Sequence, residues 1–147
     1  MAESLCDKCA ALCCRYFALQ IDTPKTAEDY DNIRWYLVHE NVVSFIEDKK
    51  WYVGVMTKCK HLQPDNRCGI YEERPRICRK YSTDNCDYHG GEYQFSRLFT
   101  SADDLRSYAE EKLGRSILPR PKSAKVGRLK GKPGKRHLEL PVLGAAR

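Results

Sequence analysis

Apolar and polar positions alternate at residues 17–22, and this period of two predicts a short strand. Downstream, apolar residues recur at the three- and four-residue intervals of a helix, at Ala27, Tyr30, Ile33 and Leu37. Thr26 and Asp29 stand where a capping box would place them at a helix start. We therefore expect a strand followed by a helix that begins near Thr26 and ends near His39.

Two segments rich in β-branched and aromatic side chains come next, at residues 42–47 and 51–57. The charged residues Asp48, Lys49 and Lys50 separate them, so the pair is expected to form a β-hairpin. The second strand of this hairpin runs directly toward Cys59. If Cys59 is a metal ligand, it is therefore held at the end of a rigid strand.

Further along, Ile70 and Tyr71 are expected to form a brief extended piece, and Pro75 suits the first turn of a short helix that runs to about Tyr81. Residues 93–99 predict one more strand. A last helix opens at the Ser101-x-x-Asp104 sequence, and its apolar positions follow helical spacing until Gly114 ends it. The expected fold class is α+β, a small cysteine-rich, metal-centred domain with a β-hairpin and short helices.

The composition changes after residue 114. Residues 1–114 hold 16 Lys and Arg against 19 Asp and Glu, whereas residues 115–147 hold 10 against the single Glu139. The formal net charge of +6 therefore belongs to the second segment, which is rich in Pro, Gly, Lys and Arg and too poor in apolar residues to offset its ordering entropy. We expect a folded domain over 1–114 and a disordered basic tail over 115–147, able to contact nucleic acid weakly.

The chain contains eight cysteines, all before residue 87. They are Cys6, Cys9, Cys13, Cys14, Cys59, Cys68, Cys78 and Cys86. The first four form a C-x2-C-x3-C-C cluster, and C-x2-C is the spacing at which two thiolates bind one ion from a tight turn. The next three lie among Pro, Asp, Asn and Gly residues that turn the chain sharply. We expect the two groups of sulfur atoms to converge on a metal, with all eight cysteines as candidate ligands.

Disulfides are the main alternative to metal. The N-terminus has acidic residues and no uninterrupted apolar run, so it does not resemble a secretory signal, and no apolar run is long enough to span a membrane. A reducing cytoplasm is therefore the expected location, where thiols serve mostly as ligands or catalysts. Zinc takes four thiolates and so does a 4Fe-4S cluster, so the cofactor is zinc or iron.

The adjacent Cys13 and Cys14 raise a separate question. Neighbouring side chains point in different directions in most backbone conformations, so one mononuclear ion is not expected to take both. Either the two residues serve different centres, or one of them is not a ligand. His61 and His89 are further candidates for ligands or for hydrogen bonds to sulfur, although a lone histidine more often lies at the surface.

Seven basic residues lie between Lys58 and Lys80 against three acidic ones, which gives this segment a local charge of +4. Positive neighbours lower thiol pKa values and offset the charge of a thiolate-bound metal, although a solvated basic face explains them equally well. No nucleotide-binding loop, nucleophile elbow or H-E-x-x-H motif occurs in the sequence. The catalytic residues, if there are any, are therefore not identified by motif.

The run Cys68-x-Ile70-Tyr71-x2-Arg74-Pro75-x2-Cys78, together with the N-terminal cluster and Cys59-x2-Leu62, resembles the YkgJ-type cysteine-cluster family of zinc- or iron-chelating domains. The resemblance covers residues 6–86. It implies a bacterial metal-binding domain whose cysteines are the ligands, with a poorly defined biochemical role. The flagellin lysine methylases look like a larger branch that carries a similar cluster. The resemblance therefore keeps open the alternative that this chain is an iron-sulfur enzyme or an enzyme accessory in protein modification.

The chain departs from the family pattern in two respects. Three residues precede its Cys-Cys pair where the family pattern has two, which bears on the roles of Cys13 and Cys14. It also has no additional domain for a methyl donor, which disfavours methylation. The sequence therefore favours a cysteine-ligated metalloprotein whose metal stabilises the fold.

Overall fold

The computed structural model describes residues 9–81, 86 and 95–120. In order, the elements are η2 (Leu12–Cys14), β1 (Phe17–Ile21), α1 (Ala27–Leu37), β2 (Val42–Glu47), β3 (Lys50–Val55), η3 (Tyr71–Glu73), α2 (Arg76–Lys80), β4 (Arg97–Phe99) and α3 (Ala102–Leu113). Some predictions fall outside the described residues. They concern Cys6 and His89, the start of the strand predicted at 93–99, and the tail beyond Arg120.

The strands form one antiparallel sheet in the order β1-β3-β2-β4. β2 and β3 are joined by Asp48 and Lys49, whose φ values of 48° and 64° match the type I′ turn that suits the twist of a two-residue hairpin. The predicted hairpin is therefore confirmed. The pairing of β1 with β3 along five residues, which local patterns do not predict, places the first strand at the edge of the sheet.

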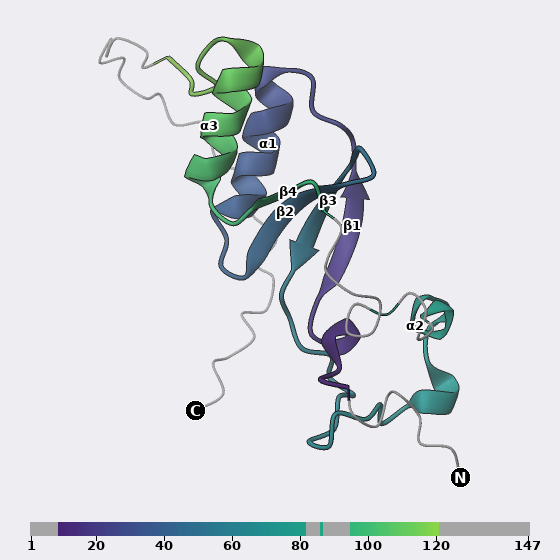
Figure 1. The fold of residues 1–147 in the computed structure, drawn as a ribbon. Helices are drawn as coiled ribbons and strands as arrows, with labels where there is room; N and C mark the ends of the chain where they lie inside the picture. The colour runs from purple at the N-terminus through teal and green to yellow at the C-terminus, as the bar shows by residue number, and fades with distance from the viewer. Residues whose placement is uncertain (1–8, 82–85, 87–94, 121–147) are drawn as a thin grey trace, which may run out of the picture.

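Helices α1 and α3 lie side by side over one end of the sheet (Figure 1). Each begins where the sequence predicts. The Thr26 hydroxyl accepts from the Asp29 N–H at 3.2 Å while the Asp29 carboxylate accepts from the Thr26 N–H at 2.8 Å, a complete capping box. Ser101 caps α3, and Gly114 ends it in the left-handed conformation at φ 64°. Both predicted helices are confirmed.

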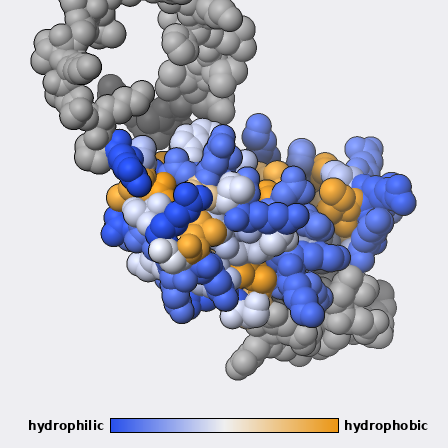
Figure 2. Space-filling model, turned by 90° about the horizontal axis from the view of Figure 1, so that it is seen from above, coloured by the Kyte–Doolittle hydropathy of each residue, from blue (hydrophilic) through white to orange (hydrophobic). Residues whose placement is uncertain are grey.

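The core lies between these two helices and the sheet. Its buried residues are Tyr30, Ile33, Leu37, Trp51, Phe99, Leu105, Ala109 and Ile117. Phe99 and Leu105 are fully buried, and the ring of Phe99 stacks on that of Trp51 with centroids 5.4 Å apart. Seen from above, the described surface is mostly hydrophilic, with hydrophobic side chains in small separate groups (Figure 2). The fold is thus α+β, as expected, with an aromatic core that contains no cysteine.

Two local predictions differ from the structure. Tyr71 is not extended but begins the 3-10 helix η3, because the Glu73 N–H bonds to the Ile70 carbonyl at 2.9 Å and closes a turn. Phe95 and Ser96 are not in a strand, since only Arg97–Phe99 pair with β2. Within the described part of the chain, no helix combines the length and apolar character that a membrane span requires.

Candidate metal centre

The sheet register explains why the two groups of cysteines meet. Phe17 at the start of β1 pairs with Val55 at the end of β3, because the two strands run antiparallel. The chain segment before β1 and the segment after β3 therefore leave the sheet at the same end, away from α1 and α3 (Figure 1). Cys14 lies three residues before the first strand and Cys59 four residues after the third, so both fall just beyond this edge.

A short backbone hydrogen bond joins the two segments directly. The Cys59 N–H donates to the Cys14 carbonyl at 2.7 Å. The Arg15 guanidinium adds a second link, since it donates to the Asn66 side-chain oxygen at 2.9 Å and, through Nε, to the Ala10 carbonyl at 2.9 Å. The expected convergence of the N-terminal and central cysteine segments is therefore present at the level of the backbone.

Between Cys59 and Gly69 the chain folds back on itself. Leu62 and Cys68 form an isolated antiparallel bridge, and the Gly69 N–H donates to the His61 carbonyl at 2.8 Å. A Cβ atom at position 69 would lie 3.1 Å from that carbonyl oxygen, so the turn requires the close approach that glycine allows. Leu62 is buried beneath the loop, and Cys68 is thereby returned toward Cys59.

Cys78 comes from the short helix α2. The residue before Pro75, Arg74, is extended at ψ 141°, as the proline demands, and its guanidinium lies 3.6 Å from the centre of the Tyr71 ring. Its Nε also donates to the Tyr71 carbonyl at 2.8 Å. The predicted helix at 75–81 is confirmed as Arg76–Lys80, and the extended Arg74 before Pro75 separates it from η3.

Two of the sulfur atoms accept backbone hydrogen bonds inside tight turns. The Ala11 N–H donates to Cys9 Sγ at 3.2 Å, and the His61 N–H donates to Cys59 Sγ at 3.4 Å. In each case the donor is two residues after the cysteine. Such bonds are among the interactions by which proteins tune thiolate-bound metals. Sequence analysis did not predict them, because they depend on the turn conformation rather than on side-chain identity.

The thiols of Cys13 and Cys14 face other thiols. The pKa of Cys13 is raised to about 12, and the largest cause is the loss of water around the sulfur. The neighbouring Cys14, Cys9 and Cys86 thiols raise it further. As a whole residue Cys13 remains exposed. Burial also raises the pKa of Cys14, with smaller contributions from Cys59, Cys68 and Cys78. This environment therefore disfavours the charged thiolate at both positions as long as no cation is bound.

The seven described cysteines are all free thiols, four of them half-buried and three exposed. Across residues 9–81, 86 and 95–120, no three His, Cys, Asp or Glu side chains are arranged as a closed ligand set. The donor set itself, sulfur with backbone N–H support, suits zinc or iron.

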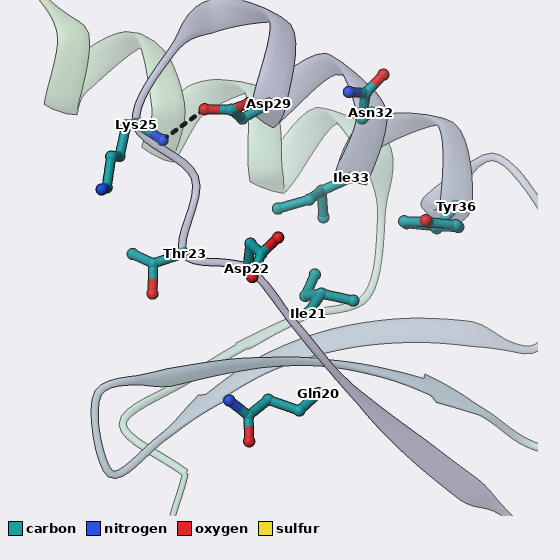
Figure 3. A pocket seen from close by; sticks show the side chains of 9 residues that line it. All are labelled: Gln20, Ile21, Asp22, Thr23, Lys25, Asp29, Asn32, Ile33 and Tyr36. Carbon is teal, nitrogen blue, oxygen red and sulfur yellow. Dashed lines mark hydrogen bonds between the residues drawn. The ribbon is translucent and has the colours of Figure 1, made fainter.

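A pocket lies elsewhere, at the opposite end of β1, between that strand and α1 (Figure 3). It is lined by Gln20, Ile21, Asp22, Thr23, Lys25, Asp29, Asn32, Ile33 and Tyr36. The Asp29 carboxylate accepts hydrogen bonds from the backbone N–H groups of Lys25 and Thr26, which lower its pKa. That carboxylate serves the helix cap, so the pocket is explained as part of the α1 terminus.

One comparison decides the family. The family model CxxCxxCC, described as "Putative zinc- or iron-chelating domain", matches residues 5–101, about two thirds of the chain. The chain belongs to this family. The resemblance inferred from the cysteine motifs is thereby confirmed, and with it the metal-chelating character of the domain. No curated protein and no solved structure matches the chain.

The N-terminal cluster departs from the CxxCxxCC pattern in one spacing. Three residues, Ala10, Ala11 and Leu12, stand between Cys9 and Cys13 where the family name has two. Ala11 takes the left-handed conformation at φ 56° and opens the 3-10 turn η2. This turn contains both Cys13 and Cys14 and lies just before β1.

Proposed function

We propose that this chain is a zinc- or iron-binding protein whose cysteines, from the segment before β1 and the segment after β3, are the ligands. The observation that carries the proposal is the 2.7 Å hydrogen bond from the Cys59 N–H to the Cys14 carbonyl, which joins two cysteine clusters far apart in the sequence. The proposed ligands are Cys6, Cys9, Cys13, Cys14, Cys59, Cys68, Cys78 and Cys86. The protein is proposed to work in a reducing cytoplasm, where these thiols stay available to metal.

The chain's own groups support this role in three ways. Cys59 and Cys68 are brought together by the Leu62–Cys68 bridge, and the Cys9 and Cys59 sulfur atoms accept backbone hydrogen bonds. The basic residues of the Lys58–Lys80 segment offset the negative charge of thiolates. When bound, zinc would supply a structural cross-link between the two segments, whereas an iron-sulfur cluster would add electron transfer.

Elemental analysis of protein purified without oxygen and without an affinity tag that binds metal tests the proposal. We expect zinc, or iron with sulfide, in stoichiometric amounts, and a loss of that metal when Cys14 and Cys59 are both replaced by serine. Replacement of Ser96 and Ser107, which lie outside the thiol region, is the matched control and should leave the metal content unchanged. Metal-free wild-type protein that takes up neither zinc nor iron would contradict the proposal.

The same experiment distinguishes the iron-sulfur alternative. Iron with an equal amount of acid-labile sulfide and visible absorption would support an enzyme or an accessory in protein modification, similar in its cluster to the lysine-methylase branch. A colourless protein that contains zinc alone would instead support a structural role. Both outcomes are compatible with thiolate ligands, because zinc and iron share them.

A second candidate function is weak nucleic-acid binding by the basic segment after residue 114. It is favoured by the 10 Lys and Arg against one Glu in residues 115–147. Because Ile117 packs in the core, the truncation that tests it should remove residues 121–147 only. We expect the full chain to bind RNA with an affinity that falls steeply with salt, and the truncated chain to lose this affinity. Equal RNA binding by both chains would contradict this function.

A further inference from the structure

β1 is an edge strand whose outer side is uncovered. In the sheet order β1-β3-β2-β4 it pairs with β3 on one side, and among the described residues no strand lies on its other side (Figure 1). The first four residues of β1 are exposed, and Phe17 and Leu19 are 49% and 58% exposed although both are large and apolar. A free strand edge of this kind is a template for pairing with another strand.

The opposite edge strand, β4, is protected in ways that natural sheets commonly use. It has only three residues and begins with Arg97, whose guanidinium lies 2.9 Å from the Asp104 carboxylate. Short length and a charged side chain both oppose the addition of a strand. β1 has five residues and carries no charge between Phe17 and Ile21. Of the two edges of this sheet, β1 is therefore the one suited to accept another strand.

The direction of the backbone groups of β3 follows from one hydrogen bond. The Met56 N–H, one residue after the end of β3, donates to the Asn41 carbonyl at 2.7 Å, so Met56 faces β2. The N–H and C=O groups of successive residues point to alternate sides of a strand. The backbone groups of Val55, Val53 and Trp51 therefore face β1.

The partners of these three residues in β1 are Phe17, Leu19 and Ile21, whose backbone groups are directed toward β3. The N–H and C=O groups of Ala18 and Gln20 are consequently directed outward, at the free edge. The side chains of Phe17, Leu19 and Ile21 share the face of the sheet that contains the buried core. Because α1 and α3 lie over one end of that face, Phe17 and Leu19 stay exposed (Figure 1).

We propose that β1 pairs with β1 of a second copy of this chain, antiparallel and about a two-fold axis at Leu19. In this register Ala18 of one copy lies opposite Gln20 of the other, so the outward backbone groups of both copies bond to each other. Leu19 lies opposite Leu19, at a position where cross-strand side chains approach most closely. Phe17 lies opposite Ile21 on the same face, so apolar side chains meet along the whole strand.

Charge favours this partner and this orientation. β1 is neutral, and it is flanked by Arg15 on one side and Asp22 on the other. Antiparallel pairing brings Arg15 of one copy to the same end as Asp22 of the other, whereas parallel pairing would bring like charges together. An interface built on one strand lies at the small end of the size range, so the dimer is expected to be reversible and to form at high protein concentration.

Sedimentation velocity of the reduced full chain tests the proposal, at concentrations from about 1 to about 500 μM, where small interfaces associate. We expect the wild-type mass to rise from one chain to two. Leu19→Lys and Leu19→Glu each place like charges directly opposite one another, so each should raise the dissociation constant by about tenfold or more. An equimolar mixture of the two variants pairs opposite charges and should restore the dimer.

A matched control and a second variant accompany these measurements. Leu98→Lys makes the same change at an exposed leucine of the other edge strand and should leave the dimer unchanged. Ala18→Pro removes an outward N–H while the pairing of β1 with β3 keeps its donors, so it should abolish the dimer. The near-ultraviolet circular dichroism of Trp51 and its aromatic neighbours, which lie in the core, reports whether each variant is folded.

Hydrogen exchange tests the register itself. The amides of Ala18 and Gln20 should exchange more slowly at high than at low protein concentration, because they are paired only in the dimer. The amide of Leu19, which is directed toward β3, is the internal control and should exchange equally at both concentrations. Protection of Ala18 and Gln20 that does not depend on concentration would overturn the proposal.

The outcomes separate this proposal from the proposed function. A single chain at every concentration overturns the pairing of β1, as does a dimer that persists in Leu19→Lys or is not restored in the mixture. None of these variants changes a cysteine, so metal content measured in the same samples should be equal in all of them. A chain that binds neither zinc nor iron contradicts the proposed function alone, because the masses judge the strand pairing independently.

Discussion

Replacing Phe99 with alanine is expected to destabilise the protein by about 3–5 kcal/mol, the usual cost of removing a fully buried aromatic ring. Phe99 has no exposed surface, stacks on Trp51 and meets Tyr108 edge-to-face at 5.1 Å. Domains of this kind have total stabilities of about 5–15 kcal/mol, so the variant is expected to be partly or wholly unfolded. Urea unfolding followed by circular dichroism and tryptophan fluorescence measures the change.

The control for this substitution is the preceding residue of the same strand. Leu98 points to the opposite face of the sheet and is 37% exposed. Leu98→Ala is expected to cost about 1 kcal/mol or less, because less apolar surface is removed from a packed environment. Equal losses of stability in the two variants would show that the core does not lie on the helix-covered face.

Removing the metal is expected to open residues 56–81 while the sheet and its two helices stay folded. In this segment only Leu62 contributes a buried apolar side chain, and none of the core residues comes from it. Metal binding contributes about 10–16 kcal/mol in the smallest structural zinc sites, far more than such a loop can obtain from burial. The metal is thus expected to stabilise the end of the molecule that carries the cysteines, and not the sheet with its two helices.

Hydrogen exchange with and without a chelator, under reducing conditions, measures this effect by segment. The amides of Cys59 and Gly69, which donate to the Cys14 and His61 carbonyls, should exchange faster by a factor on the order of a hundred or more after chelation. The amides of β2 and β3, which form the centre of the sheet, are the internal control and should change little. Unaltered exchange at Cys59 and Gly69 would contradict a structural role for the metal.

The parts of the fold that sequence predicts correctly are those set by local physics. The Thr26 capping box, the periodic apolar positions of α1 and α3 and the hairpin at Asp48–Lys49 each involve residues a few positions apart. The pairing of β1 with β3 joins residues 30 to 38 positions apart, and no local pattern specifies it. The turn at Tyr71 is not predicted, because Ile70 and Tyr71 are residue types that favour strands. In the structure a backbone hydrogen bond closes a turn there, and no strand pairs with these residues.

The candidate site shows the same limit. Residue type and spacing identify the cysteines and the family, and these need no knowledge of the fold. The partners of each cysteine depend on the end of the sheet at which β1 begins and β3 ends, and on the 3-10 turn at η2. Whether Cys13 and Cys14 serve two centres, or one of them is not a ligand, stays open from the sequence, because spacing alone does not say which thiols lie near each of them.

The separation of the aromatic core from the cysteine segments has a consequence for a cell under oxidative stress or metal starvation. The segment after β3 already exposes Tyr71 and Ile77, whereas Trp51, Phe99 and Leu105 are buried in the core beneath α1 and α3. Damage to the sulfur atoms therefore leaves the core of the domain covered. Such a chain can keep its core folded until reductant and fresh metal are supplied.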